Sequence, residues 1–215
     1  MKKIFYTLIL FIFSSLNAYA ADLPEKLFGV KLKDHIAIYA DKRKYKESFM
    51  PKGTLSFKLS TKDELKEIKP NDIFDYYFLT TKKDLKVLSI EAIKEYPDVK
   101  SENFNNVCLS ELQKLNKTLA DLYNVDPNKF KRRDYKVKDD TFTYLIQTKS
   151  LNYRMAGESI RLFIRCGHVG VKGQVASLLS LGFMTQEHFK TDWLPLLEDM
   201  KLISNEFIKK DLRGF

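Results

Sequence analysis

Hydrophobic residues between Asn106 and Tyr123 recur at alternating steps of four and three, which is the spacing of one face of an α-helix. The members of this stripe are Cys108, Leu112, Leu115, Leu119 and Leu122. An amphipathic helix must bury such a stripe against another layer of structure. We therefore expect a helix over Asn106–Tyr123 with Cys108 on its buried face.

Alternation of hydrophobic and polar positions predicts β-strands on both sides of this helix. The predicted strands are Thr54–Ser60, Ile73–Thr80, Leu85–Tyr96, Phe142–Lys149 and Ser159–Val169. The stretch Val175–Met184 is ambiguous, because its alternation favours a strand whereas its alanine and leucines would also suit a helix. Residues Lys129–Asp140 are mostly polar, and we interpret them as a surface connection.

A second amphipathic helix is expected near the C-terminus, with Asp192 as its N-cap and Pro195 in its first turn. Its apolar face would consist of Trp193, Leu196, Leu197, Met200, Ile203 and Phe207. The sequence thus predicts an α+β fold, in which two main helices cover a mostly antiparallel sheet.

Two strands share a pattern of alternating aromatic residues, Phe74–Thr80 and Phe142–Thr148. Each is followed by a second predicted strand and later by an amphipathic helix. This order indicates two ββα units. The alternative is that any two alternating aromatic strands look alike.

The N-terminus has the features of a signal peptide over Met1–Ala20. Two lysines precede an apolar run of about ten residues, and Ala-Tyr-Ala then ends the segment at Ala20. We expect cleavage after Ala20, release into a periplasmic or extracellular space, and a single globular domain over 21–215. The alternative is an uncleaved N-terminal anchor. No later stretch of the sequence is apolar for long enough to form a transmembrane segment.

The chain is basic, with a formal net charge of +9. Removal of the two N-terminal lysines leaves +7. A basic exported protein could bind an acidic protein, a glycan or a lipid surface. The lysines are spread along the whole chain, however, as on an ordinary solvated surface, and export argues against nucleic acid as a partner.

The sequence contains two cysteines, Cys108 and Cys166. Strand alternation places Cys166 on the same face as Leu162 and Ile164, and this face would receive the helical stripe. Disulfides persist in oxidising compartments, so export favours a bond between the two cysteines. The alternative is a pair of inert buried thiols.

Catalytic signatures are missing: the sequence has no G-x-S-x-G, H-E-x-x-H, Walker or dinucleotide-binding motif. The histidines are His35, His168 and His188, and His188 could meet Asp192 near a helix start. Cys166 could join His168 and His188 around a metal, but a disulfide would consume its thiolate. We therefore assign no catalytic residue, metal ligand or cofactor.

The most suggestive polar feature is a row formed by Arg161, Phe163 and Arg165, opposite the face of Cys166. An arginine–aromatic–arginine row could hold a carboxylate, a phosphate or a sugar ring. The favoured interpretation is more ordinary. It is a solvated sheet face, where arginine stems cover the phenyl ring and acids on neighbouring strands pair with the guanidinium groups.

Two classes of function fit these observations. The first is an exported, non-catalytic binding or cell-envelope accessory protein that recognises an anionic ligand or partner. The second is a small secreted hydrolase with a dispersed, histidine-based active site. An enzyme requires a pocket in which histidine, acid and nucleophile converge, whereas a surface of arginine and aromatic residues favours binding.

Overall fold

The computed structural model describes residues 23–40, 46–47, 53–60, 67–96, 101–138, 142–171 and 174–199. The predicted signal peptide, Met1–Ala20, lies outside the described residues. So do Met200, Ile203 and Phe207 of the second predicted helix.

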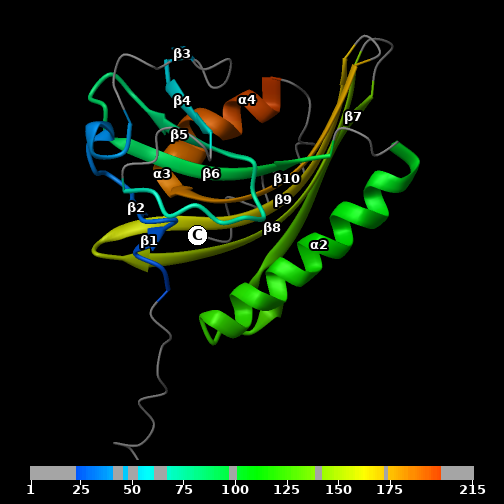
Figure 1. The fold of residues 1–215 in the computed structure, drawn as a ribbon, viewed down its shortest axis with the longest axis horizontal. Helices are drawn as coiled ribbons and strands as arrows, with labels where there is room; N and C mark the ends of the chain where they lie inside the picture. The colour runs from blue at the N-terminus through cyan, green and yellow to red at the C-terminus, as the bar shows by residue number, and fades with distance from the viewer. Residues whose placement is uncertain are drawn as a thin grey trace, which may run out of the picture.

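Within the described residues, eight strands form one antiparallel sheet in the order β3-β4-β5-β6-β10-β9-β8-β7 (Figure 1). In chain order the strands are β3 (Lys46–Glu47), β4 (Leu55–Ser60), β5 (Tyr76–Thr81), β6 (Val87–Glu95), β7 (Lys131–Lys138), β8 (Phe142–Met155), β9 (Glu158–Val171) and β10 (Gln174–Thr185). All five strands predicted from alternation are confirmed, with small shifts of their ends. The α+β prediction is confirmed as well.

The sequence did not predict the secondary structure of two stretches that the structure places in the sheet. Val175–Met184 lies within β10, which pairs with both β6 and β9 at the centre of the sheet. The interpretation of Lys129–Asp140 as a surface connection was wrong, because β7 pairs with β8 as the edge strand. Polar side chains suit an edge, where few of them are buried, and they hide the alternation from which a strand is predicted.

The long helix α2 (Ser101–Leu122) confirms the first predicted helix and starts earlier than expected. Cys108, Leu112 and Leu119 are buried against the sheet, and Leu115 is partly buried. Leu122 does not belong to the buried stripe, because it is the last residue of α2 and its side chain is 67% exposed. A short 3-10 turn, η3 (Pro127–Lys129), then leads into β7.

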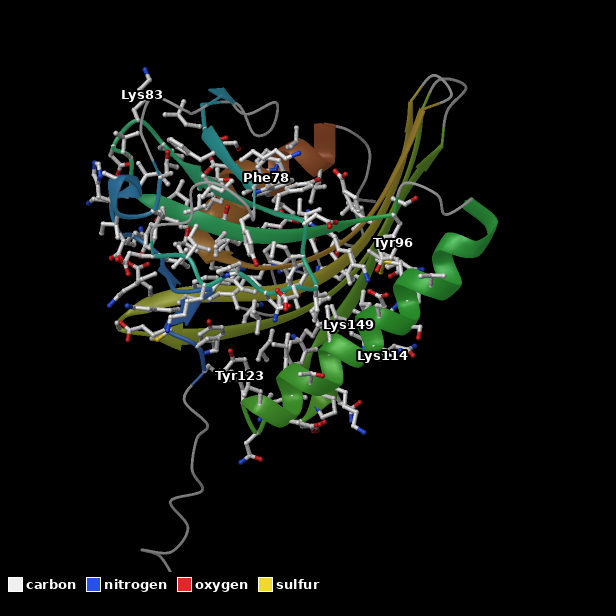
Figure 2. All side chains as sticks on the ribbon, viewed as in Figure 1. Phe78, Lys83, Tyr96, Lys114, Tyr123 and Lys149 are labelled. Carbon is white, nitrogen blue, oxygen red and sulfur yellow. A yellow bond between two sulfur atoms is a disulfide. The ribbon has the colours of Figure 1, made fainter. Side chains whose placement is uncertain are left out.

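The disulfide between Cys108 and Cys166 is present, as predicted. The two Cα atoms are 5.9 Å apart, within the range that an unstrained bond requires. The bond joins α2 to β9 across the face of the sheet that we call the α2 face. Figure 2 shows the labelled residues Tyr96 and Lys149 on the same side of the sheet as α2.

An N-terminal segment covers the remainder of the α2 face. It contains the small hairpin of β1 (Lys26–Leu27) and β2 (Val30–Lys31), followed by the 3-10 turn η1 (Ile36–Ile38). Its buried side chains belong to the same hydrophobic core as the sheet and α2: Leu27, Val30, Leu32, Ile36, Tyr39 and Ala40. The larger hydrophobic core of the protein therefore lies on the α2 face of the sheet, between the sheet and the segments that cover it.

The opposite face of the sheet is covered by a C-terminal segment over 186–199. It consists of α3 (Gln186–His188), the π-helical η4 (Phe189–Trp193) and α4 (Leu194–Asp199). The prediction of Asp192 as N-cap was wrong, because the helical segment starts directly after β10. There the side chain of Thr185 accepts a hydrogen bond from the backbone N–H of His188 at 3.2 Å. Asp192 lies inside the helical segment instead.

Strands followed by a helix thus occur twice along the chain. The first run, β3–β6, leads to α2, and the second run, β7–β10, leads to the C-terminal segment. The two runs meet where β6 pairs with β10. Their helices cover opposite faces of the sheet (Figure 1), so the strand order recurs while the placement of the helix does not.

Candidate functional site

The predicted row of Arg161, Phe163 and Arg165 lies on β9, on the face opposite the disulfide. The expectation that this face is solvated was wrong. Arg161 is 2% exposed and Phe163 is 3% exposed, because the C-terminal segment packs over them. The row is therefore the floor of a covered site.

A pocket lies between this face and the C-terminal segment, and we call it the arginine pocket. The sheet contributes Ile146, Thr148, Arg161, Phe163, Arg165 and Met184, and the C-terminal segment contributes Phe189, Trp193 and Leu197. Sites for small molecules are lined mostly by apolar and aromatic side chains with a few polar groups. The arginine pocket has this composition.

The π-helical turn η4 brings two aromatic rings over the two arginines. Its widened hydrogen bond runs from the backbone N–H of Leu194 to the carbonyl of Phe189. The Phe189 ring centroid lies 4.0 Å from Cζ of Arg161, and that of Trp193 lies 5.5 Å from Cζ of Arg165. Single π-helical turns are rare and occur frequently at functional sites, and here the turn forms the roof of the pocket.

Arg165 is held in place by three further contacts. Its Nε donates to Oγ of Ser180 at 3.2 Å, and its Nη2 donates to Oε1 of Glu91 in a short ion pair. Its Cζ lies 4.9 Å from the ring centroid of Phe163. An acid does pair with Arg165, as expected, but it lies on β6, which β10 separates from β9, and not on a neighbouring strand. These contacts fix the orientation of the guanidinium group.

Gly182 on β10 provides the space for Phe163. A Cβ atom at this position would lie 2.6 Å from Cζ of Phe163 and 2.4 Å from the carbonyl oxygen of Ile90. Neither contact is possible without a shift of the backbone or the ring. The missing side chain therefore leaves room for the phenyl ring of Phe163, which lines the pocket.

The roof of the pocket is attached to the sheet by a polar clamp of His188, Asp192 and Lys82. Nδ1 of His188 lies 2.7 Å from Oδ2 of Asp192, and Nζ of Lys82 lies 3.0 Å from the same oxygen. Burial lowers the pKa of His188, and this outweighs the opposite effect of Asp192. Burial opposes ionisation of Asp192, but hydrogen bonds from His188 and Lys82 outweigh it and lower the pKa of the carboxyl group.

His188 and Asp192 are arranged like the histidine and the acid of a catalytic triad, whose third member is a nucleophile. Because Asp192 is ionised and accepts, neutral His188 must donate from Nδ1, which leaves Nε2 as an acceptor. Nε2 is buried and has no hydrogen-bond partner among the described residues. No serine, threonine or cysteine of this part of the chain therefore donates a hydrogen bond to it, as a nucleophile would.

The other candidate residues do not gather at this site. Nδ1 of His35 accepts from the backbone N–H of Ala37 at a helical turn far along the chain. Cys166 is engaged in the disulfide, and the side chain of His168 lies outside the described part of the structure. Within the described ranges, no group of three or more histidine, cysteine or acidic residues is placed to hold a metal ion.

Sequence reasoning found the floor of the pocket and missed its roof. Trp193 and Leu197 were assigned to the apolar face of a helix, which is correct, but nothing placed that helix over Arg161 and Arg165. A usable signal was present, since Phe189, Trp193 and Leu197 recur at intervals of four. The face of the sheet that such a stripe covers depends on the path of the chain after β10, which local spacing does not contain.

The fold and the site together define an α+β protein whose antiparallel sheet carries helices on both faces and a partly apolar pocket beneath one of them. No helix in the described part of the chain is long and apolar enough to cross a membrane. In comparisons with known proteins, the chain matches no family model, no curated protein and no solved structure.

Proposed function

We propose that this chain is an exported, non-catalytic binding protein whose ligand occupies the arginine pocket. The observation that carries the proposal is the pocket itself, which is lined by two arginines, three aromatic rings and several aliphatic side chains. The export part of the proposal rests on the signal-peptide pattern of Met1–Ala20. The Cys108–Cys166 disulfide is compatible with an oxidising compartment.

The shape of the pocket favours a small ligand over a macromolecular partner. An acidic protein, a glycan or a lipid surface would be expected to bind a broad basic face. Arg161 is almost fully buried, and the side chain of Arg165 is 14% exposed, so neither can lie flat against a large surface. A small molecule entering between the sheet and the C-terminal segment can reach both.

Trp193 gives a direct test, because it is the only tryptophan of the chain and it lines the pocket. We expect small amphipathic probes, namely octanoate, 1-octanol and octylamine, to change its fluorescence in a saturable way for at least one of the three. The variant Ile146→Phe should abolish the change, since it fills the pocket from the sheet side.

The matched control is Ile38→Phe, which makes the same change at an exposed position away from the pocket. Both variants are first checked for a cooperative thermal transition. Fluorescence that no probe alters in the wild-type protein, or a response that survives equally in both variants, would rule out the arginine pocket as the binding site.

A hydrolase is the second candidate, and the 2.7 Å contact between His188 and Asp192 is the observation in its favour. A histidine base must reach the proton that it abstracts, and Nε2 of His188 is buried. We expect chromogenic acetyl and butyryl esters to be hydrolysed at the same rate with and without the wild-type protein. A rate that rises with protein concentration and disappears in His188→Gln would favour the enzyme.

A further inference from the structure

The arginine pocket contains a buried hydrogen-bond donor that has no acceptor among the described residues, the indole N–H of Trp193. Arg165 stands beside it and uses Nε for Ser180 and Nη2 for Glu91, so Nη1 is the guanidinium nitrogen that these two bonds do not engage. An indole nitrogen can only donate, and so can a guanidinium group.

These donors lie close together. Cζ of Arg165 is 5.5 Å from the ring centroid of Trp193. Thr148, which carries a hydroxyl donor, is the cross-strand partner of Arg165 on β8 and lines the same pocket. One oxygen-rich group placed between β8 and η4 could therefore accept from three different side chains.

A buried donor without an acceptor costs about 1–3 kcal/mol relative to one that is satisfied. For the indole N–H of Trp193, no acceptor among the described residues relieves this cost, and the residues that line the pocket include no aspartate or glutamate. A bound molecule can supply the missing acceptor. The remaining lining side chains, among them Ile146, Met184 and Leu197, are apolar and suit a hydrocarbon or aromatic body.

We infer that the ligand of the arginine pocket is a monocarboxylate with an apolar body. Its carboxylate accepts from Nη1 of Arg165, from the indole N–H of Trp193 and from the hydroxyl of Thr148, and its body lies against the apolar wall. A carboxylate fits the planar guanidinium group and provides enough lone pairs for all three donors. Glu91 neutralises one side of Arg165 and fixes the direction in which the free side points. This inference rests on the proposed binding function.

The test compares three probes that share one apolar chain: octanoate, 1-octanol and octylamine. Dissociation constants are measured by titrating the fluorescence of Trp193 in the purified protein. Hydrogen bonds to charged groups contribute about 1.5–3 kcal/mol each, so octanoate should bind at least about tenfold more tightly than 1-octanol. Octylamine should bind most weakly, since it brings a cation to a wall of donors.

The role of Arg165 is tested with the double variant Glu91→Gln, Arg165→Gln, which removes both charges of the ion pair together and leaves neither buried alone. It should lose the preference for octanoate and bind 1-octanol as the wild-type protein does. The matched control is Arg154→Gln, at an exposed arginine on the β8–β9 hairpin, which should keep the preference. A second variant, Trp193→Phe, keeps an aromatic ring and removes the N–H. Because this variant has no tryptophan fluorescence, its binding is measured by calorimetry. We expect its affinity for octanoate to be about three- to tenfold weaker than that of the wild-type protein.

Three results would overturn parts of this account, and they are distinguishable. Equal or tighter binding of 1-octanol or octylamine refutes the carboxylate while the binding function stands. An undiminished preference for octanoate in the double variant, together with an undiminished octanoate affinity in Trp193→Phe, refutes the assigned donors. Failure of all three probes to bind refutes the proposed function itself, and the carboxylate inference with it.

Discussion

His188 carries the polar clamp that holds the pocket roof, and it is buried in its neutral form. Its pKa is lowered from the ordinary value of 6.5 because burial disfavours the imidazolium ion. In the unfolded chain the same histidine takes up a proton near pH 6.5. Below this pH the unfolded state therefore binds more protons than the folded state, and the free energy of unfolding must fall.

We predict that the stability of the protein decreases as the pH is lowered from 7 to 5, with His188 contributing at most about 1.4 kcal/mol per pH unit. Asp192 contributes only at lower pH, because its folded-state pKa lies below 3.8. The variant His188→Gln can still donate to Asp192 but does not titrate. Urea unfolding at several pH values should show a shallower dependence for this variant, and an unchanged slope would contradict the account of the clamp.

For single residues, the sequence predicted the direction of the side chain better than its burial. Cys108 and Cys166 were paired correctly, because helical and strand periodicity each fix the direction of a side chain. Arg161, Phe163 and Arg165 were placed on the correct face of β9 for the same reason. Their burial could not be predicted, since it depends on a segment that follows β10 and returns over that face.

The helix α2 shows where a periodic stripe ends. Leu119 is buried against the sheet, whereas Leu122, one turn later, is 67% exposed. We predict that Leu119→Ala lowers the free energy of unfolding by about 2–4 kcal/mol, because it leaves a cavity in the core. Leu122→Ala makes the same chemical change on the surface and should cost less than about 0.5 kcal/mol. Chemical denaturation of the two variants checks this, and equal losses would contradict the assigned orientation of α2.

Among the elements, the strands and α2 were predictable because each has a single repeating period. The C-terminal segment combines α3, the π-helical η4 and α4 within fourteen residues, 186–199, so no single period describes it. Its N-cap was placed at Asp192, a good capping residue, although Thr185 fulfils that role. The edge strand β7 was missed because its many lysine and arginine side chains hide the short alternation of Tyr135 and Val137.

At the scale of the whole molecule, the disulfide connects the two runs of strands, since Cys108 follows the first run and Cys166 belongs to the second. The bond closes a loop with a sequence separation of 58 residues. The chain-entropy model assigns such a loop about 4 kcal/mol of stabilisation.

We predict that the double variant Cys108→Ala, Cys166→Ala melts about 8–15 °C below the oxidised protein, as expected for a loss of that size in a chain of this length. Non-reducing peptide mapping of protein taken from its own compartment should show the two cysteines joined. Free thiols at both positions in that material, or equal melting temperatures of the variant and the oxidised protein, would contradict this assignment.

The arrangement of the whole sheet was only partly accessible from the sequence. An antiparallel sheet under helices follows from the order and periodicity of the predicted elements. The pairing of β6 with β10, and the placement of the two helical layers on opposite faces, arise from contacts between residues far apart in the chain. That placement creates the arginine pocket, so the site depended on information that no local pattern contains.

The central claim is that the arginine pocket around Trp193 binds a ligand, and the indole N–H of that residue reports on it directly. Because Trp193 is the only tryptophan, a ¹H–¹⁵N spectrum of the labelled protein contains one indole cross-peak. We predict that this peak moves progressively as octanoate is added, and to a smaller extent with 1-octanol, as the unpartnered N–H gains an acceptor or a new neighbour. An indole peak that stays in place with both probes up to their solubility limits, in a protein whose backbone spectrum is that of a folded domain, would contradict the claim.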